Sequence, residues 1–316
     1  MQGKKGCPPE EVKDLLRGVI NIQFTPFRSV SEIDEGALRD NTRFMIEAGI
    51  VTGTGAQVIG GSNGEGFSLS DAEFKRLIDV VVDEAKGRVP VIVACLRLGT
   101  MPVVDLARYA QQAGADALLI LPPLYYPNPS DEVILSHFRE VAGAVDISIM
   151  IYNHPGITGK DMSVDCLMHL AEIDSIVALK ETTGNMGKLR EVAYRLGDRF
   201  AINANTYRVI SPLDFQFGIV GHNNFIGNYD PKTALEVTVA AAGGDFRGCQ
   251  QIWKRFLKLN GYVFSADMYR TTSFGKEMAR IVGRPMGDVE RLPLKRPDEK
   301  EREKLKQMMI QAGIAV

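Results

Sequence analysis

The sequence has little of what marks several functional classes. Four cysteines and four histidines are scattered over 316 residues, without a CxxC pair or a metal-ligand spacing, so we expect reduced thiols, no disulfide framework and no metal site. Its apolar runs are shorter than the ~18 residues that cross a bilayer. The N-terminus lacks the apolar segment of a secretory signal. Acidic and basic residues nearly balance, 39 against 37, which argues against nucleic acid or an anionic membrane as a partner. We therefore expect a cytoplasmic protein.

Short apolar runs alternate with longer amphipathic stretches through most of the chain. The runs are Gly18–Phe24, Ala56–Gly60, Pro90–Cys95, Ala117–Leu121, Ile147–Tyr152, Ser175–Leu179, Phe200–Ala204 and Gly218–Phe225. Their nearly continuous Val, Ile, Leu and Ala content indicates parallel strands that are covered on both faces. Ser70 and Ser130 precede two of the amphipathic stretches as helix N-caps. Eight strands, each followed by a helix, predict an α/β fold of the (β/α)8 TIM-barrel class. A doubly wound open sheet is disfavoured because no glycine fingerprint follows the first strand.

The strand pattern ends near residue 232. Four helical segments follow: Thr233–Ala242, Phe246–Asn260, Thr272–Ile281 and Glu299–Ala312. We therefore divide the chain into an N-terminal extension (1–16), a barrel (17–232) and a C-terminal helical appendage (233–316).

Reacting groups of such a barrel gather at the C-terminal ends of the strands. Lys180 directly follows four apolar strand residues, where burial disfavours the ammonium form and leaves an amine nucleophile that can form an imine with a ketone. Tyr152 ends the preceding strand and can donate or accept a proton. The glycine-rich loop around Ser62 and Asn63 suits a small carboxylate. Alone, each feature also fits a structural role: a lysine reaching solvent, a capping tyrosine, an ordinary turn.

Together, these pieces resemble the dihydrodipicolinate synthase/N-acetylneuraminate lyase superfamily of Schiff-base aldolases, and the likeness covers nearly the whole chain. The matching motifs are Thr25-Pro26-Phe27, Gly61-Ser62-Asn63-Gly64-Glu65, Pro123-Leu124-Tyr125-Tyr126, Tyr152-Asn153-His154-Pro155-Gly156-Ile157-Thr158-Gly159, Leu179-Lys180-Glu181-Thr182-Thr183-Gly184 and Gly283-Arg284-Pro285-Met286-Gly287 with Arg291-Leu292-Pro293. They occur in the family's order at matching intervals.

The resemblance implies roles for individual residues. Lys180 is the Schiff-base lysine and Tyr152 the acid/base tyrosine. Ser62 and Asn63 hold the carboxylate of the 2-oxo acid. Tyr126 crosses a dimer interface and completes a Ser62–Tyr126–Tyr152 proton relay in the neighbouring subunit. The remaining expected substrate contacts are Thr25, Thr182, Ala204 and Phe225.

The chain departs from the family pattern at several positions. Ile157 stands where synthases acting on aspartate semialdehyde carry an arginine for that substrate's second carboxylate, and losing such a pair forfeits about 1.5–3 kcal/mol of binding. Arg97 is a candidate to compensate from another strand end. Ala204 and Asn205 replace a glycine–acidic pair, and the sequence offers no account of His222.

We therefore expect a lyase that makes or breaks a carbon–carbon bond between pyruvate, or another 2-oxo acid, and an aldehyde, with no metal or cofactor. The resemblance implies a homo-oligomer, a dimer of dimers. Three alternatives stay open: a 2-keto-3-deoxy sugar acid dehydratase or hydratase-aldolase that uses the same imine, a 4-hydroxy-tetrahydrodipicolinate synthase, which Ile157 disfavours, and a non-catalytic keto-acid-binding homologue. The sequence does not name the aldehyde.

Overall fold

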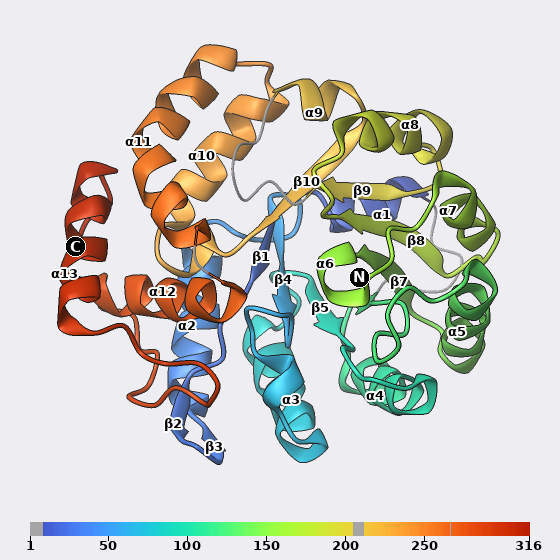
Figure 1. Cartoon of the computed structure of the whole chain (residues 1–316), viewed down its shortest axis with the longest axis horizontal. Helices are drawn as coiled ribbons and strands as arrows, with labels where there is room; N and C mark the ends of the chain where they lie inside the picture. The colour runs from blue at the N-terminus through green and yellow to red at the C-terminus, as the bar shows by residue number, and fades with distance from the viewer. Residues whose placement is uncertain (1–8, 205–211, 266) are drawn as a thin grey trace.

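The computed structural model of the protein describes residues 9–204, 212–265 and 267–316. Eight parallel strands close into a barrel in the order β1-β10-β9-β8-β7-β6-β5-β4, with helices around it (Figure 1). The strands are β1 (Gly18–Ile22), β4 (Gly55–Ile59), β5 (Val91–Ala94), β6 (Ala117–Ile120), β7 (Ser148–Asn153), β8 (Ile176–Glu181), β9 (Ala201–Ala204) and β10 (Ile219–Asn224). The predicted TIM barrel is therefore confirmed.

Helices follow each barrel strand along the chain. They are α2 (Glu35–Glu47), α3 (Asp71–Ala85), α4 (Thr100–Ala113), α5 (Asp131–Ala144), α7 (Val164–Ala171), α8 (Met186–Leu196), α9 (Pro212–Gln216) and α10 (Pro231–Ala242). Ser70 and Ser130 cap α3 and α5 by accepting hydrogen bonds from the backbone amides of Glu73 and Val133, which are the caps that the sequence indicates.

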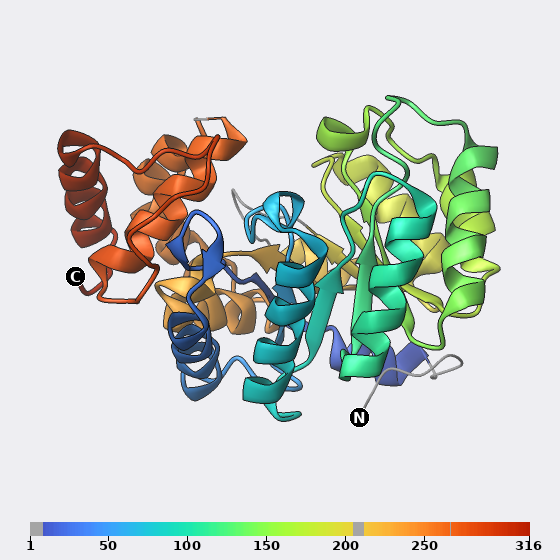
Figure 2. The ribbon, with the colours of Figure 1, turned by 90° about the horizontal axis from the view of Figure 1, so that it is seen from below.

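Short helices and strands lie at both ends of the barrel. β2 (Phe27–Ser29) and β3 (Glu32–Ile33) form a hairpin after β1, η1 (Gly66–Ser68) follows β4, α6 (Pro155–Thr158) follows β7 and η2 (Ile226–Asn228) follows β10. α1 (Pro9–Leu15) contacts β8 and β9. In Figure 2, α1 lies at the lower end of the barrel, opposite the C-terminal ends of the strands.

The C-terminal helices are α11 (Phe246–Phe264), α12 (Met268–Ile281) and α13 (Glu299–Gln311); they stand to one side of the barrel (Figures 1 and 2). α10, by contrast, packs against β1. We therefore propose that α10 is the eighth helix of the barrel, and that the C-terminal helical region starts after residue 243 rather than at residue 233.

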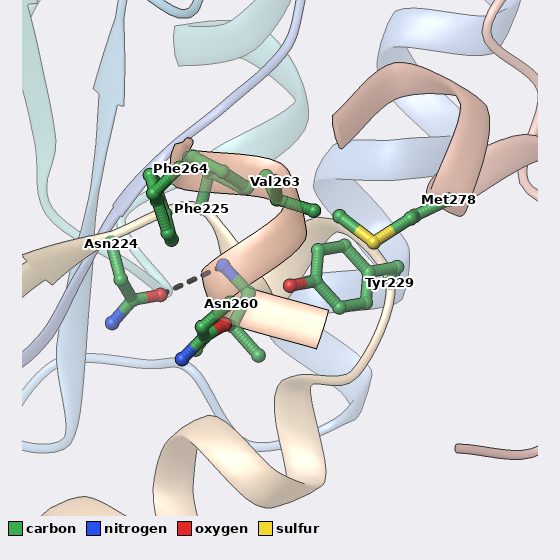
Figure 3. A pocket seen from close by; sticks show the side chains of 8 residues that line it. Asn224, Phe225, Tyr229, Asn260, Val263, Phe264 and Met278 are labelled. Atoms are coloured by element: carbon green, nitrogen blue, oxygen red, sulfur yellow. Dashed lines mark hydrogen bonds between the residues drawn. The ribbon is translucent and has the colours of Figure 1, made fainter. Parts of the chain in front are cut away.

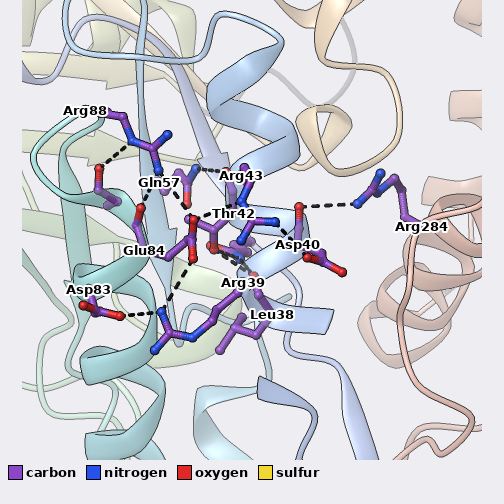
Figure 4. Close-up of polar contacts among 12 residues, drawn as sticks. Leu38, Arg39, Asp40, Thr42, Arg43, Gln57, Asp83, Glu84, Arg88 and Arg284 are labelled. Atoms are coloured by element: carbon purple, nitrogen blue, oxygen red, sulfur yellow. Dashed lines mark hydrogen bonds and ion pairs between the residues drawn. The ribbon is translucent and has the colours of Figure 1, made fainter. Parts of the chain in front are cut away.

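Polar contacts fix α2 against its neighbours outside the barrel (Figure 4). Arg43 Nε lies 3.2 Å from Glu84 Oε1 on α3. Arg284, which follows α12, donates to the carbonyl oxygen of Asp40 at 3.3 Å. The first contact joins α2 to α3, and the second joins the segment after α12 to α2.

His222 on β10 has a structural explanation. Asn224 Nδ2, which can only donate, bonds to His222 Nδ1 at 3.1 Å, so the imidazole proton sits on Nε2 and is donated to Thr238 Oγ1 on α10. Thr238 Oγ1 donates in turn to Ala234 O at 2.6 Å. Burial lowers the pKa of His222 to about 4, so the ring is neutral and joins β10 to α10.

No helix among the described residues is both long and apolar enough to traverse a bilayer. The cysteines within the described ranges, Cys95, Cys166 and Cys249, are buried and unpaired, whereas Cys7 lies outside them.

Candidate active site

Lys180 and Tyr152 lie side by side at the C-terminal ends of two adjacent strands. They are register partners on β8 and β7, and Lys180 Nζ lies 4.0 Å from the centroid of the Tyr152 ring. Only 1% of the Lys180 surface is exposed. Burial lowers its pKa to about 7 because the desolvated ammonium loses its hydration. The amine is therefore uncharged in about half of the molecules at pH 7 and can act as a nucleophile.

The strand on the other side of Lys180 supplies amides instead of carboxylates. Asn203 on β9 is its register partner, and Asn223 lies on the next strand, β10. Both side chains are buried, and within the described part of the chain neither Oδ1 has a hydrogen-bond partner. No charged residue is thus in register with Lys180 on either neighbouring strand to hold the amine as an ammonium ion.

His154 is a further residue of this site that the sequence reasoning missed. It follows Tyr152 by two positions, and the two rings meet edge to face with centroids 5.3 Å apart. Burial, assisted by the charge of Lys180, lowers the pKa of His154 to about 4. A neutral imidazole therefore flanks the phenol ring. The period-two spacing of strand residues is the sequence signal that could have found it.

The loop after β4 brings Ser62 and Asn63 to the same end of the barrel. Ser62 Oγ is buried without a hydrogen-bond partner among the residues that the structure describes, which suits a ligand oxygen. Asn63 is 1% exposed, and its Nδ2 donates to Thr272 Oγ1 on α12 at 3.0 Å. Thr25 Oγ1 donates to Gly64 O at 2.6 Å. The loop closes so tightly that a Cβ on Gly66 would lie 1.9 Å from Gly60 O, so only glycine fits there.

The rim beyond β7 and β8 is held by a polar cluster that faces away from Lys180. Asn153 Nδ2 donates to Glu181 Oε2 and to Asp161 Oδ1, both at 2.8 Å, and Lys188 Nζ lies 3.3 Å from Glu181 Oε2. Thr182 Oγ1 donates to Asn153 O at 2.7 Å. The Thr182 hydroxyl proton is therefore engaged by the backbone, and a substrate contact there stays a prediction.

Tyr126 lies apart from these residues. It is 80% exposed, and its ring meets that of Tyr125, itself 68% exposed, edge to face at 5.1 Å. The relay through Tyr126 stays a prediction that requires a second subunit.

Ala204 ends β9, Phe225 directly follows β10, and both are buried. The Phe225 ring packs against Phe24 and Phe264, with centroids 5.5 and 5.7 Å away. It borders a small pocket between the barrel and the C-terminal helices (Figure 3), which is lined by Asn224, Phe225, Ile226, Tyr229, Asn260, Val263, Phe264 and Met278. Substrate contacts of Ala204 and Phe225 stay predictions, and Asn205 lies outside the described residues.

Arg97 is engaged by the loop after β4. Its guanidinium donates to Gly66 O at 3.0 Å and to Leu69 O at 3.3 Å, and lies 3.1 Å from Asp71 Oδ1. Compensation by Arg97 for the arginine missing at position 157 therefore stays a prediction. In the described part of the chain, no group of three or more His, Cys, Asp or Glu side chains is arranged to hold a metal ion.

A closed barrel with a buried, partly deprotonated lysine beside a tyrosine at its catalytic face defines the class of Schiff-base lyases. Residues 15–312 match the model of the dihydrodipicolinate synthetase family. The 4-hydroxy-tetrahydrodipicolinate synthase of Rhodopseudomonas palustris (strain BisA53) is 33% identical over 299 residues, which cover 95% of this chain and 97% of that protein. The chain belongs to the dihydrodipicolinate synthetase family, and it is a lyase of the pyruvate-dependent class I aldolase type.

Solved structures agree with this assignment. The crystal structure of dihydrodipicolinate synthase from Aquifex aeolicus has a TM-score of 0.85 and 30% identity, covering 95% of this chain and 98% of that chain. The chloride-inhibited dihydrodipicolinate synthase from Acinetobacter baumannii, complexed with pyruvate, has a TM-score of 0.84 and 27% identity, covering 95% of this chain and 100% of that chain.

Proposed function

We propose that the protein is a class I aldolase that joins or separates pyruvate and an aldehyde through an imine at Lys180. The observation that carries this proposal is the buried amine of Lys180, whose pKa is about 7, 4.0 Å from the centroid of the Tyr152 ring. The pyruvate in the related Acinetobacter baumannii structure supports a 2-oxo acid as the first substrate.

The chemistry follows from an uncharged amine. Lys180 Nζ adds to C2 of pyruvate, and loss of water leaves an imine. The protonated imine accepts the electron pair when C3 loses a proton, which gives an enamine. C3 then attacks the aldehyde carbon, the aldehyde oxygen takes up a proton, and water hydrolyses the imine to release a 4-hydroxy-2-oxo acid. The Tyr152 phenol is the group placed to give and take these protons, and no step requires a metal or a cofactor.

We assign binding of the pyruvate carboxylate to the loop of Ser62 and Asn63. The unpaired Ser62 hydroxyl supplies a donor there, and the buried Asn63 fixes the loop that presents it. Thr25 supports the same loop through its bond to Gly64 O. The exposed Tyr126 is assigned to a neighbouring subunit's site, which makes the proposed functional form a homo-oligomer, a dimer of dimers.

A second candidate, 4-hydroxy-tetrahydrodipicolinate synthase, is favoured by the name of the Rhodopseudomonas relative. Against it stand the aliphatic side chain of Ile157 and the engagement of Arg97 by Gly66, Leu69 and Asp71, which leave aspartate semialdehyde's carboxylate without either guanidinium. Incubation with pyruvate and a panel of aldehydes that includes aspartate semialdehyde, followed by product analysis, separates the two. A separate panel of 2-oxo acids that includes 2-keto-3-deoxy sugar acids identifies a dehydratase, because dehydration releases no aldehyde.

Borohydride trapping tests the imine itself. Pyruvate with borohydride should leave an irreversible adduct on Lys180, which peptide mass spectrometry locates. An unmodified Lys180 under saturating pyruvate contradicts the proposal, and pyruvate binding without trapping would identify a non-catalytic keto-acid-binding protein.

A further inference from the structure

Two residues of α12 reach from the C-terminal region to the loop after β4. Thr272 Oγ1 accepts from Asn63 Nδ2 at 3.0 Å, and Lys276 Nζ donates to Glu65 Oε1 at 2.7 Å. Thr272 and Lys276 are four residues apart, so they lie on one face of the helix. Both contacts therefore meet the segment that begins with Ser62.

The conformation of Glu65 shows that its side chain has a specific role. Glu65 has a φ of 58°, in the left-handed region that favours glycine, yet the position carries a long charged side chain. That side chain is fully buried, as is that of Lys276. The ion pair therefore holds the loop in a backbone conformation that the residue would not adopt readily by itself.

Lys276 and Thr272 are themselves held in place on α12. Lys276 Nζ lies 2.9 Å from Glu290 Oε2, and Arg280 Nη2 lies 2.8 Å from Glu290 Oε1. Both are ion pairs whose geometry does not meet the angle required of a hydrogen bond. Thr272 Oγ1 donates to Met268 O at 3.1 Å, so its lone pairs remain for Asn63. α12 also approaches the barrel closely, since a Cβ on Gly275 would lie 2.5 Å from Phe24 Cζ.

We infer that Thr272 and Lys276 are positioning residues that hold the Ser62–Asn63 loop in the shape that binds the carboxylate of the 2-oxo acid. The inference rests on the proposed function, because it takes the loop as the carboxylate site. It makes α12 a determinant of affinity for the first substrate, without contact with the reacting atoms.

The test compares two neighbouring threonines. T272V removes the acceptor for Asn63 and keeps the shape of the side chain. T271V is the matched control, because Thr271 is 2% exposed on the same helix but donates to Val263 O of α11 at 3.0 Å. Calorimetry measures the dissociation constant of pyruvate, and borohydride trapping at saturating pyruvate measures the reactivity of Lys180.

T272V should weaken pyruvate binding about five- to tenfold, the value of one hydrogen bond, with the same final trapping yield. T271V should bind pyruvate as the wild-type protein does, and T272S should restore affinity. If T272V does not fold, E65Q replaces it, since the amide keeps the shape and loses the charge that Lys276 binds; it should also weaken binding.

The outcomes separate this inference from the proposed function. Wild-type affinity in T272V or E65Q, or equal weakening in T272V and T271V, overturns the positioning role. Absence of pyruvate binding in the wild-type protein overturns it too. Wild-type binding without trapping contradicts only the proposed chemistry.

Discussion

The reactivity of Lys180 should follow the titration of its own ammonium group. Its pKa falls from 10.5 to about 7, so at pH 7 the uncharged fraction rises from about 1 in 3,000 for an ordinary lysine to about one half. Only the neutral amine attacks pyruvate. Imine formation should therefore rise about tenfold per pH unit below pH 7 and level off above about pH 8.

Exchange of the pyruvate methyl protons with deuterium measures this step, because the enamine returns to pyruvate by taking up solvent deuterium. The rate is followed by NMR between pH 5 and 10, with a Lys180→Met variant as the background. A rate that keeps climbing to pH 10, as an ordinary lysine would give, refutes the argument from burial.

Asn203→Asp perturbs the same amine from the adjacent strand. Asn203 is the register partner of Lys180, and neighbouring strands are about 4.8 Å apart. A carboxylate there favours the ammonium form and should raise the pKa of Lys180 by about one to two units. The exchange profile should move to higher pH by the same amount and reach a similar plateau. An unshifted profile would show that the two side chains do not face each other.

Three further changes test the surroundings of the site. Lys180→Met should abolish trapping yet raise the free energy of unfolding by about 1–3 kcal/mol, measured in urea at pH 7. Because the native pKa of about 7 lies below the unfolded value of 10.5, the wild-type protein loses stability as the pH falls from 10.5 to 7, so the gain from the variant should shrink steadily as the pH rises through the same range. Lys276→Met should lower the free energy of unfolding by about 3–5 kcal/mol, because it leaves Glu65 buried without its counterion. Adding Glu65→Gln should recover part of this loss. A double variant as unstable as Lys276→Met alone would contradict the pairing. Ile157→Arg should raise kcat/KM for aspartate semialdehyde about tenfold in a coupled assay. The same variant should show no gain in kcat/KM for an aldehyde without a carboxylate.

The barrel could be predicted because its strands are apolar on both faces. Ile176-Val177-Ala178-Leu179 has no polar residue, as a strand between the barrel interior and its helices requires. The β2–β3 hairpin was not predicted, because Phe27-Arg28-Ser29 is too short to show an alternation of apolar and polar residues and Glu32–Ile33 has only two residues.

The site was predictable where position along a strand determines chemistry, as for Lys180 and Tyr152. It was not predictable where side chains distant in sequence meet. Arg97 sits at a strand end like a substrate ligand, yet carbonyl groups of the loop around Gly66 engage it. Asn63 meets Thr272, 209 residues later, and no local pattern of hydrophobicity or spacing encodes that contact.

The pairing of Glu65 with Lys276 has a consequence for the order in which the protein matures. The two residues are 211 positions apart, so a nascent chain that has emerged only through β10 can form every barrel strand but carries Glu65 without its counterion. Co-translational folding can thus complete the barrel strands early, whereas the loop after β4 acquires its final form only after α12 has left the ribosome.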